Sequence, residues 1–237
     1  RFAFSLFPSF AAVSRRFEEA LEQRNRLLKE PFLDVDALDA FTPPFVSAAA
    51  ELTRLRAEAS ARWSPVFAAE AFAIGGEALA AELSYDSGLV GEQWSSSSPI
   101  PSTAALEDVL LQRLNAGRDI ERRKKSTLCG PQHDDVVIEK AGRRARFLAS
   151  QGEARALVLA LKLASVRILT EARGQPPLLL LDDVAGELDA SRAQRLLSSL
   201  DEHGVQCFVT TTDVSTLPPL GDSRVFRVRA GHVGDAG

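Results

Sequence analysis

The chain has 237 residues, of which 45% are hydrophobic and 25% charged, and its formal net charge is −4. This composition is ordinary for a soluble globular protein and allows a sizeable core. The acidic balance excludes nucleic-acid binding through overall charge, so any such contact must come from local basic patches. No stretch resembles a membrane span or a signal peptide. Cys129 and Cys207 follow no metal-binding spacing, so we expect reduced thiols in a cytoplasmic protein.

The first half of the chain is predicted to be mainly helical. Apolar residues recur at three- and four-residue steps and predict helices over residues 1–30, 44–60, 65–75 and 104–124. Residues 79–85 alternate and predict a short strand. Residues 91–103 are rich in serine and proline and predict a loop, which ends in Ser102 and Thr103 as the cap of the next helix.

After Ser126 the pattern changes to strands alternating with helices. We expect a hairpin from residues 136–138 and 144–148, helices over 151–172 and 191–200, and strands over 178–181, 206–210 and 224–228. This alternation predicts an α/β fold with a mostly parallel sheet and flanking helices. The predicted domains are a helical lobe over residues 1–125 and a sheet-containing domain over residues 126–237.

Four consecutive leucines, residues 178–181, end in Asp182 and Asp183. A short apolar run after Pro176 and Pro177 predicts a strand buried on both faces of a parallel sheet. Ligands bind at the carboxyl ends of such strands, and two adjacent carboxylates there are costly without a cation. The pattern therefore predicts a Mg²⁺ and phosphate site. The structural alternative is that Asp183 caps a turn.

Three further motifs have both a structural and a functional interpretation. Ser150 and Glu153 fit a capping box, while the same helix start, with Gly152 allowing close approach, fits a phosphate cradle. Glu187, Leu188 and Asp189 fit either a helix cap or a subunit contact. Residues 210–213 follow a strand and form either an ordinary turn or part of the same crevice.

These motifs, in this order and spacing, resemble those of the RecF family of DNA-repair ATPases, which are related to ABC-type and chromosome-maintenance ATPase heads. The resemblance implies a partial ABC-type head with a helical insertion lobe. It implies Asp182 as the Mg²⁺ ligand and, as catalytic groups, Asp183, Thr212 and Asp213. It implies that the signature residues Ser150, Gln151, Gly152 and Glu153 bind the γ-phosphate of ATP held by the opposite subunit, and that Glu187, Leu188 and Asp189 form the D-loop.

The same resemblance implies the function of the whole protein. It would be a slow, Mg²⁺-dependent ATPase that forms an ATP-dependent homodimer on gapped or junction DNA, with double- and single-stranded parts. It would act with RecO and RecR in loading RecA and in the SOS response, with no membrane contact. No Gly-x-x-x-x-Gly-Lys-Ser/Thr string occurs in the chain, which begins at Arg1 and contains no methionine. We therefore expect a part of a longer protein that does not hydrolyse ATP alone.

Basic clusters are the candidate DNA contacts. The first set is Arg122, Arg123, Lys124 and Lys125, together with Arg143 and Arg144. A further candidate patch on the first helix is Arg16, Arg24 and Arg26. The alternative for each is a solvated charged face. Residues 130–135 resemble a RecF stretch, Gly-Pro-His-Arg-Asp-Asp, but carry Gln132 and His133 at its centre.

Two other functions stay open on the sequence. One is another chromosome-maintenance ATPase head, although no sustained heptad is visible. The other is a binding module that keeps the motifs for packing and has no catalytic activity.

Overall fold

The computed structural model describes residues 6–32, 34–89, 92–94, 98–182, 190–202, 204–217 and 223–235. The chain divides into two compact units, Arg1–Pro176 and Pro177–Gly237. The predicted boundary at residues 125–126 does not coincide with this division, because α5 (Gln151–Arg173) packs against α3 (Val35–Gly75) within the first unit. The functional division into a lobe and a head remains a prediction.

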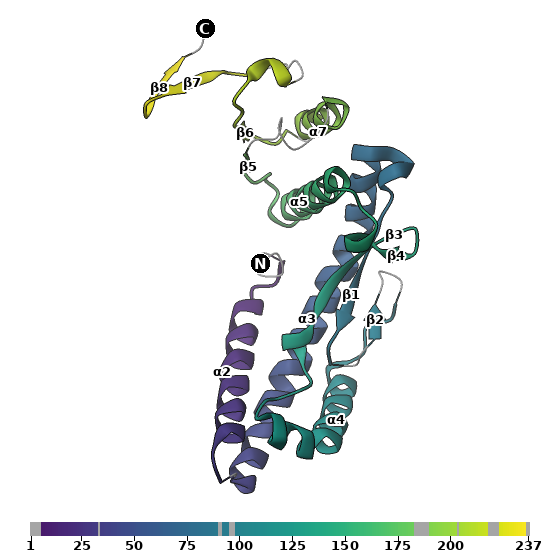
Figure 1. Cartoon of the computed structure of the whole chain (residues 1–237), viewed down its shortest axis with the longest axis vertical. Coiled ribbons are helices and arrows are strands. Elements are labelled where there is room, and N and C mark those ends of the chain that lie inside the picture. Colours follow the sequence, from purple (N-terminus) through teal and green to yellow (C-terminus); the bar gives the residue numbers. More distant parts are fainter. Residues whose placement is uncertain are drawn as a thin grey trace. The chain divides into compact units, whose positions relative to one another are not determined.

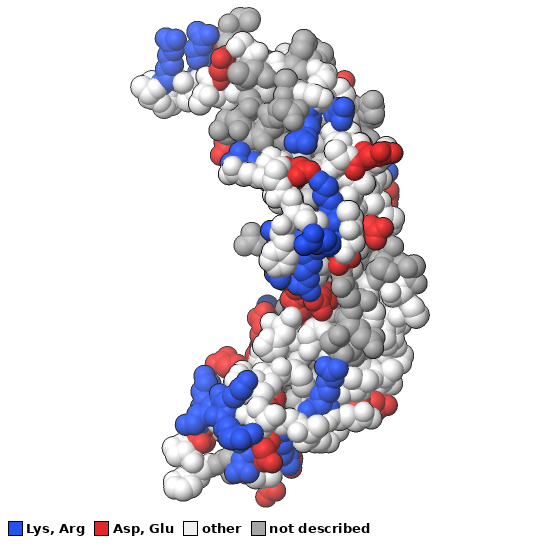
Figure 2. All heavy atoms as spheres, turned by 45° about the vertical axis from the view of Figure 1, so that its right-hand side comes forward, with Lys and Arg blue, Asp and Glu red and all other residues white. Residues whose placement is uncertain are grey.

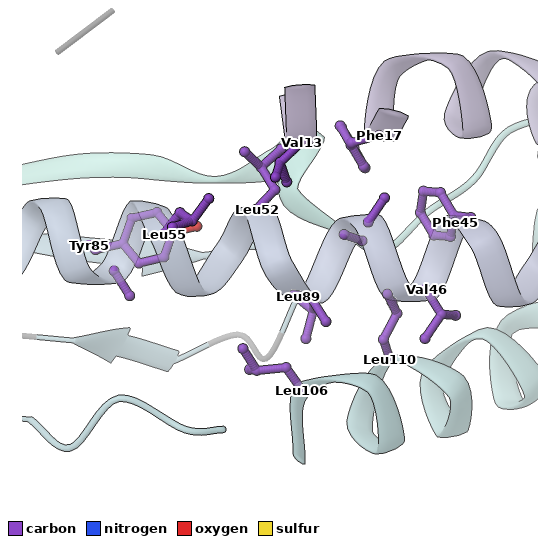
Figure 3. Packing of buried hydrophobic residues seen from close by; sticks show 14 of the residues in the cluster. Val13, Phe17, Phe45, Val46, Leu52, Leu55, Tyr85, Leu89, Leu106 and Leu110 are labelled. Atoms are coloured by element: carbon purple, nitrogen blue, oxygen red, sulfur yellow. The ribbon is translucent and has the colours of Figure 1, made fainter. Parts of the chain in front are cut away.

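The first unit is built on the 41-residue helix α3. Helix α2 (Phe10–Lys29) and helix α4 (Thr103–Lys124) pack against it (Figure 1). Phe17 of α2 and Phe45 of α3 meet with ring centroids 5.8 Å apart. Figure 3 shows this core, to which Leu106 and Leu110 of α4 and Tyr85 also contribute. The predicted helix over residues 104–124 is confirmed, and the one over residues 1–30 is confirmed from Phe10, while residues 7–9 lie outside a helix.

Helix α3 replaces the two separate helices predicted over residues 44–60 and 65–75. It continues through Pro43, Pro44 and Pro65, each of which lacks a backbone N–H and removes one helical hydrogen bond. All three prolines are exposed, so the carbonyl groups that lose their partners can be hydrated. Packing of the opposite face against other elements holds the helix together across these positions.

A four-stranded antiparallel sheet completes the first unit. Its strands are β1 (Glu82–Ser87), β2 (Glu92–Trp94), β3 (Asp135–Lys140) and β4 (Arg143–Arg144), in the order β2-β1-β3-β4. Strand β2 lies inside the predicted loop over residues 91–103, so that prediction was wrong there. The three-residue strand is too short to show a pattern, but Trp94 is buried beside Tyr85, with ring centroids 5.8 Å apart.

The predicted hairpin is confirmed as β3 and β4, with a shorter second strand. Ala141 and Gly142 connect the strands, and both have positive φ, 51° and 71°, as a two-residue hairpin turn of the I′ type requires. After β4 the chain turns into a short 3₁₀ helix, Ala145–Phe147, and then into α5. The hairpin and the start of α5 are therefore close in sequence.

In the second unit, the described residues form a parallel pair of strands, β5 (Leu179–Leu181) and β6 (Cys207–Val209), with α7 (Ala190–Glu202) between them in the chain. The predicted strand at residues 224–228 belongs instead to an antiparallel hairpin of β7 (Phe226–Arg229) and β8 (His232–Asp235). The two strands are joined at Ala230 and Gly231. Strand β8 was not predicted, because its four residues show no alternation of apolar and polar side chains long enough to indicate a strand.

The leucine strand is buried on one face only. Leu181 is 4% exposed, whereas Leu180 is 69% exposed and its cross-strand partner Phe208 is 52% exposed. The prediction of burial on both faces was therefore wrong for this chain. The physical reason is that a pair of strands has apolar side chains on both faces, and the described residues of this unit bury the face of Leu181 but not that of Leu180. Among the described helices, none is long and apolar enough to span a bilayer.

Candidate functional site

Asp182 and Thr210 lie together at the carboxyl end of the parallel pair. Asp182 directly follows β5 and Thr210 directly follows β6. The backbone N–H of Thr210 donates to the carbonyl of Leu181 at 2.9 Å, which extends the ladder to this point. The Thr210 hydroxyl donates a hydrogen bond to Oδ1 of Asp182. The structure thus brings together a carboxylate and a hydroxyl that are 28 residues apart.

This pair offers oxygen atoms of the kind that hard cations bind. Both side chains are exposed, and carboxylate and hydroxyl oxygens are hard ligands that suit Mg²⁺ with its retained waters. No group of three or more His, Cys, Asp or Glu residues suited to a metal occurs in the part of the chain that the structure describes. The candidate residues Asp183, Glu187, Leu188 and Asp189 lie outside the described residues.

Asp213, the predicted switch residue, is engaged in a local turn. Its Oδ1 accepts hydrogen bonds from the backbone N–H and the hydroxyl of Ser215, at 2.9 Å and 2.7 Å. These two bonds hold the pKa of the Asp213 carboxyl below its usual range. Thr212 beside it is exposed. The turn interpretation accounts for Asp213, and its catalytic role stays a prediction.

The predicted capping box at the start of α5 is present. The backbone N–H of Glu153 donates to Ser150 Oγ at 3.3 Å, and Glu153 Oε2 accepts from the Ser150 N–H at 2.8 Å. The Ser150 side chain also forms a hydrogen bond with the Glu153 carboxylate, so the cap engages both groups of Ser150. The N–H groups of Gln151 and Gly152 belong to the first turn, where the helix itself provides no partner.

Lys140 is a site residue that sequence reasoning missed. Its ammonium group, at the end of β3, forms an ion pair with Oε1 of Glu153. The hydrogen bond from Lys140, followed by those from Ser150, lowers the pKa of Glu153 to about 2. The only sequence signal was a lysine just before the hairpin turn, and nothing in its spacing pointed to Glu153.

The basic run after α4 is exposed, as the DNA-contact prediction requires. Arg122, Arg123, Lys124 and Lys125 are all exposed, and Lys125 ends the helix in the left-handed conformation, with φ 53°. Figure 2 shows basic side chains gathered at the lower end of the first unit. Arg143 is also exposed, while Arg144 is paired with Asp86 at 2.9 Å. Their contact with DNA stays a prediction.

Arg24 is not available for a phosphate, which corrects the predicted patch on the first helix. It is buried and donates to Glu121 at 2.6 Å and to Thr127 at 2.7 Å. Arg16 and Arg26 of the same helix are exposed, although each also has a carboxylate partner. The proposed patch therefore loses its central residue.

Residues 130–135 form a structural junction. The carboxylate of Asp134 is 3% exposed and accepts hydrogen bonds from Arg56 at 2.8 Å, from the N–H of Gly88 at 3.0 Å and from the Tyr85 hydroxyl. Burial raises the pKa of Asp134, although these bonds oppose the shift. The same burial, with the Asp134 charge, raises the pKa of Tyr85. This stretch thus joins α3, β1 and β3 and requires no ligand.

Comparisons with known proteins give a consistent set of relatives. No family model matches the chain. It is 43% identical over 223 residues to the DNA replication and repair protein RecF of Symbiobacterium thermophilum, covering 92% of this chain and 57% of that protein. It is 39% identical over 236 residues to RecF of Anaeromyxobacter sp. strain K, covering 98% and 61%.

Solved structures give the same result. The structures described as the recombination mediator protein RecF-ATPrS and RecF-ATP in the RecFOR pathway each match with a TM-score of 0.79, at 25% and 26% identity. Each match covers 98% of this chain and 60% of the solved chain. The chain therefore spans about three fifths of the length of the relatives it matches.

Proposed function

Because the chain belongs to the RecF family of DNA replication and repair proteins, we propose that it supplies part of a composite ATP site in a DNA-binding protein of recombinational repair. The whole protein would bind ATP, hydrolyse it slowly with Mg²⁺ and form an ATP-dependent homodimer in the cytoplasm. It would act at gapped or junction DNA, with RecO and RecR, and assist RecA loading. The observation that carries the proposal is the hydrogen bond between Thr210 and Asp182 at the ends of two parallel strands.

Asp182 and Thr210 are the residues that would hold Mg²⁺. A bound Mg²⁺ ion would neutralise charge on the phosphate oxygens during phosphoryl transfer. Thr210 keeps the Asp182 carboxylate oriented through its hydrogen bond to Oδ1. Asp183, next in the chain, would orient the attacking water, and Thr212 and Asp213 would lie on the same side of the strands.

The start of α5 would bind the terminal phosphate of a nucleotide held by a second copy of the protein. The capping box holds Ser150 at the helix start, with its Oγ accepting from the Glu153 N–H. The N–H groups of the first turn add a partial positive charge. With Ser150, Gln151, Gly152 and Glu153 supplied by the opposite subunit, ATP would stabilise the dimer in proportion to its binding. Glu187, Leu188 and Asp189 would contact the partner near this site.

The exposed basic run at residues 122–125, with Arg143 and Arg144, would contact DNA phosphates. Such contacts carry no sequence information but release counterions, so binding would weaken steeply with salt. This agrees with a protein that selects DNA structure and not base sequence. The overall charge of −4 makes these local clusters necessary.

The test uses the protein as its gene encodes it and the variant Asp182→Asn. We expect this variant to lose ATP turnover by at least about 100-fold, because a neutral amide holds Mg²⁺ poorly. Asp201→Asn, which removes an exposed carboxylate on α7, is the matched control and should behave as wild type. Unchanged ATP-dependent dimerisation and turnover in Asp182→Asn would reject the ATPase role and leave a binding module.

A further inference from the structure

Lys140 has a fixed position at the end of β3. Strand β3 pairs with β1 on one side and β4 on the other, and Lys140 lies directly opposite Arg143. The two-residue turn at Ala141 and Gly142 fixes this register. The ammonium group of Lys140 therefore reaches Glu153 from a strand whose position is set by its pairing with β1 and β4.

Glu153 is shared between the helix cap and Lys140. One carboxylate oxygen accepts from the Ser150 N–H, and the other contacts the Lys140 ammonium group. Both partners of the ion pair are about four-fifths buried, with side-chain exposures of 21% and 19%. At this depth the pair is screened less than a surface ion pair.

The negative charge of Glu153 has two opposite effects at the start of α5. A carboxylate in the first turn favours the helix, because it complements the helix dipole. The same charge opposes a phosphate at that helix end, where Ser150, Gln151 and Gly152 would bind it and Glu153 would act as the capping residue. Lys140 cancels the charge of Glu153 while leaving the capping hydrogen bonds in place.

We propose that Lys140 is a positioning residue of the composite ATP site, which neutralises Glu153 and fixes the capping box so that Ser150 and the first turn of α5 can receive a nucleotide phosphate. The inference rests on the proposed function. Lys140 lies in the β3–β4 hairpin, outside the signature residues 150–153. Lys140 does not contact the nucleotide in this account and acts through Glu153.

Variants that change the charge of Lys140 or Glu153 test this role. Lys140→Gln leaves an uncompensated carboxylate, so we expect a higher ATP requirement for dimerisation. Lys140→Arg keeps the charge and should retain the wild-type requirement. Adding Glu153→Gln to Lys140→Gln removes the unwanted charge while keeping a residue that can complete a capping box, so this double variant should recover.

The measurement is the Mg-ATP concentration that gives half-maximal dimer in sedimentation velocity, made on the protein as its gene encodes it. We expect about a tenfold increase for Lys140→Gln and a return to within about threefold of wild type for the double variant. Arg54→Gln removes a partly exposed ion pair with Glu58 on α3 and is the control that should show no change. Urea unfolding of each variant reports any general loss of stability.

The outcomes separate this inference from the proposed function. A double variant as impaired as Lys140→Gln, or a Lys140→Gln variant equal to wild type, would overturn the role of Lys140 while the proposed function stands. A wild-type protein that stays monomeric at saturating Mg-ATP would overturn both. Recovery in the double variant alone, with Arg54→Gln unchanged, supports the charge-neutralising role.

Discussion

Arg24 donates a 2.6 Å hydrogen bond to Glu121, and both side chains are only 2% exposed. The two residues join α2 to the last turn of α4. Arg24 also lies over the ring of Phe45, 5.7 Å from its centroid, and Glu121 accepts a further bond from the Leu128 N–H at 2.8 Å. The basic run that begins at Arg122 is therefore anchored by a buried pair one residue earlier.

Replacing Arg24 tests this anchor. Arg24→Met keeps much of the apolar volume but leaves Glu121 buried without its charge partner, so we expect a loss of about 3–5 kcal/mol in the free energy of unfolding. Arg26→Met removes an exposed arginine of the same helix and should cost less than about 1 kcal/mol. Urea unfolding followed by circular dichroism measures both. Equal small losses would show that the buried pair contributes nothing to stability.

We expect that replacing a proline within helix α3 stabilises the protein. Pro65→Ala restores a backbone N–H in an exposed helix interior, where proline costs about 3 kcal/mol. Part of this gain is offset because alanine gives the unfolded chain more freedom, by about 0.4–1 kcal/mol. We expect a net stabilisation of about 2 kcal/mol, seen as a higher melting temperature. Pro31→Ala, outside the helices, should give no such gain, and a destabilised Pro65→Ala would contradict the account of α3.

The ion pair of Lys140 and Glu153 predicts a pH dependence. The pKa of Glu153 is about 2 in the folded chain, below its ordinary value of 4.5. Its stabilising contribution is therefore complete above about pH 4.5 and is lost as the pH falls towards 2.

The comparison of wild type with Glu153→Gln isolates this contribution from other titrating carboxylates. We expect wild type to be more stable by up to about 1 kcal/mol at pH 6 and the difference to shrink at pH 3. Urea unfolding of both proteins at the two pH values makes the measurement. A difference that grows at low pH would contradict the assigned ion pair.

The sequence predicted most elements that repeat over many residues. The helices α2, α4 and α5 have long amphipathic patterns, and α4 and α5 begin at the capping residues Ser102 and Ser150. The continuity of α3 could not be predicted, because proline is a local signal against helix and the packing that outweighs it comes from distant residues. Strand β2 has three residues, too few for any periodicity.

The site was predicted where its residues follow a local rule. The strand-end position of Asp182 and the capping box of Ser150 and Glu153 depend on neighbours within a few residues. Contacts such as Arg24 with Glu121 and Asp134 with Arg56 join residues 97 and 78 positions apart. One sequence without aligned relatives carries no signal for such pairs. Arg24 was consequently assigned to the surface, and Lys140 was not assigned at all.

The most direct test of the central claim, that Asp182 and Thr210 form the metal-binding edge of an ATP site, is metal binding itself. Mn²⁺, a hard cation that replaces Mg²⁺, can be titrated by electron paramagnetic resonance into the whole protein with ATP present. We expect one ATP-dependent Mn²⁺ site per subunit, weakened at least tenfold in Asp182→Asn and to a smaller degree in Thr210→Val. Mn²⁺ binding of equal affinity in wild type and Asp182→Asn would contradict the claim.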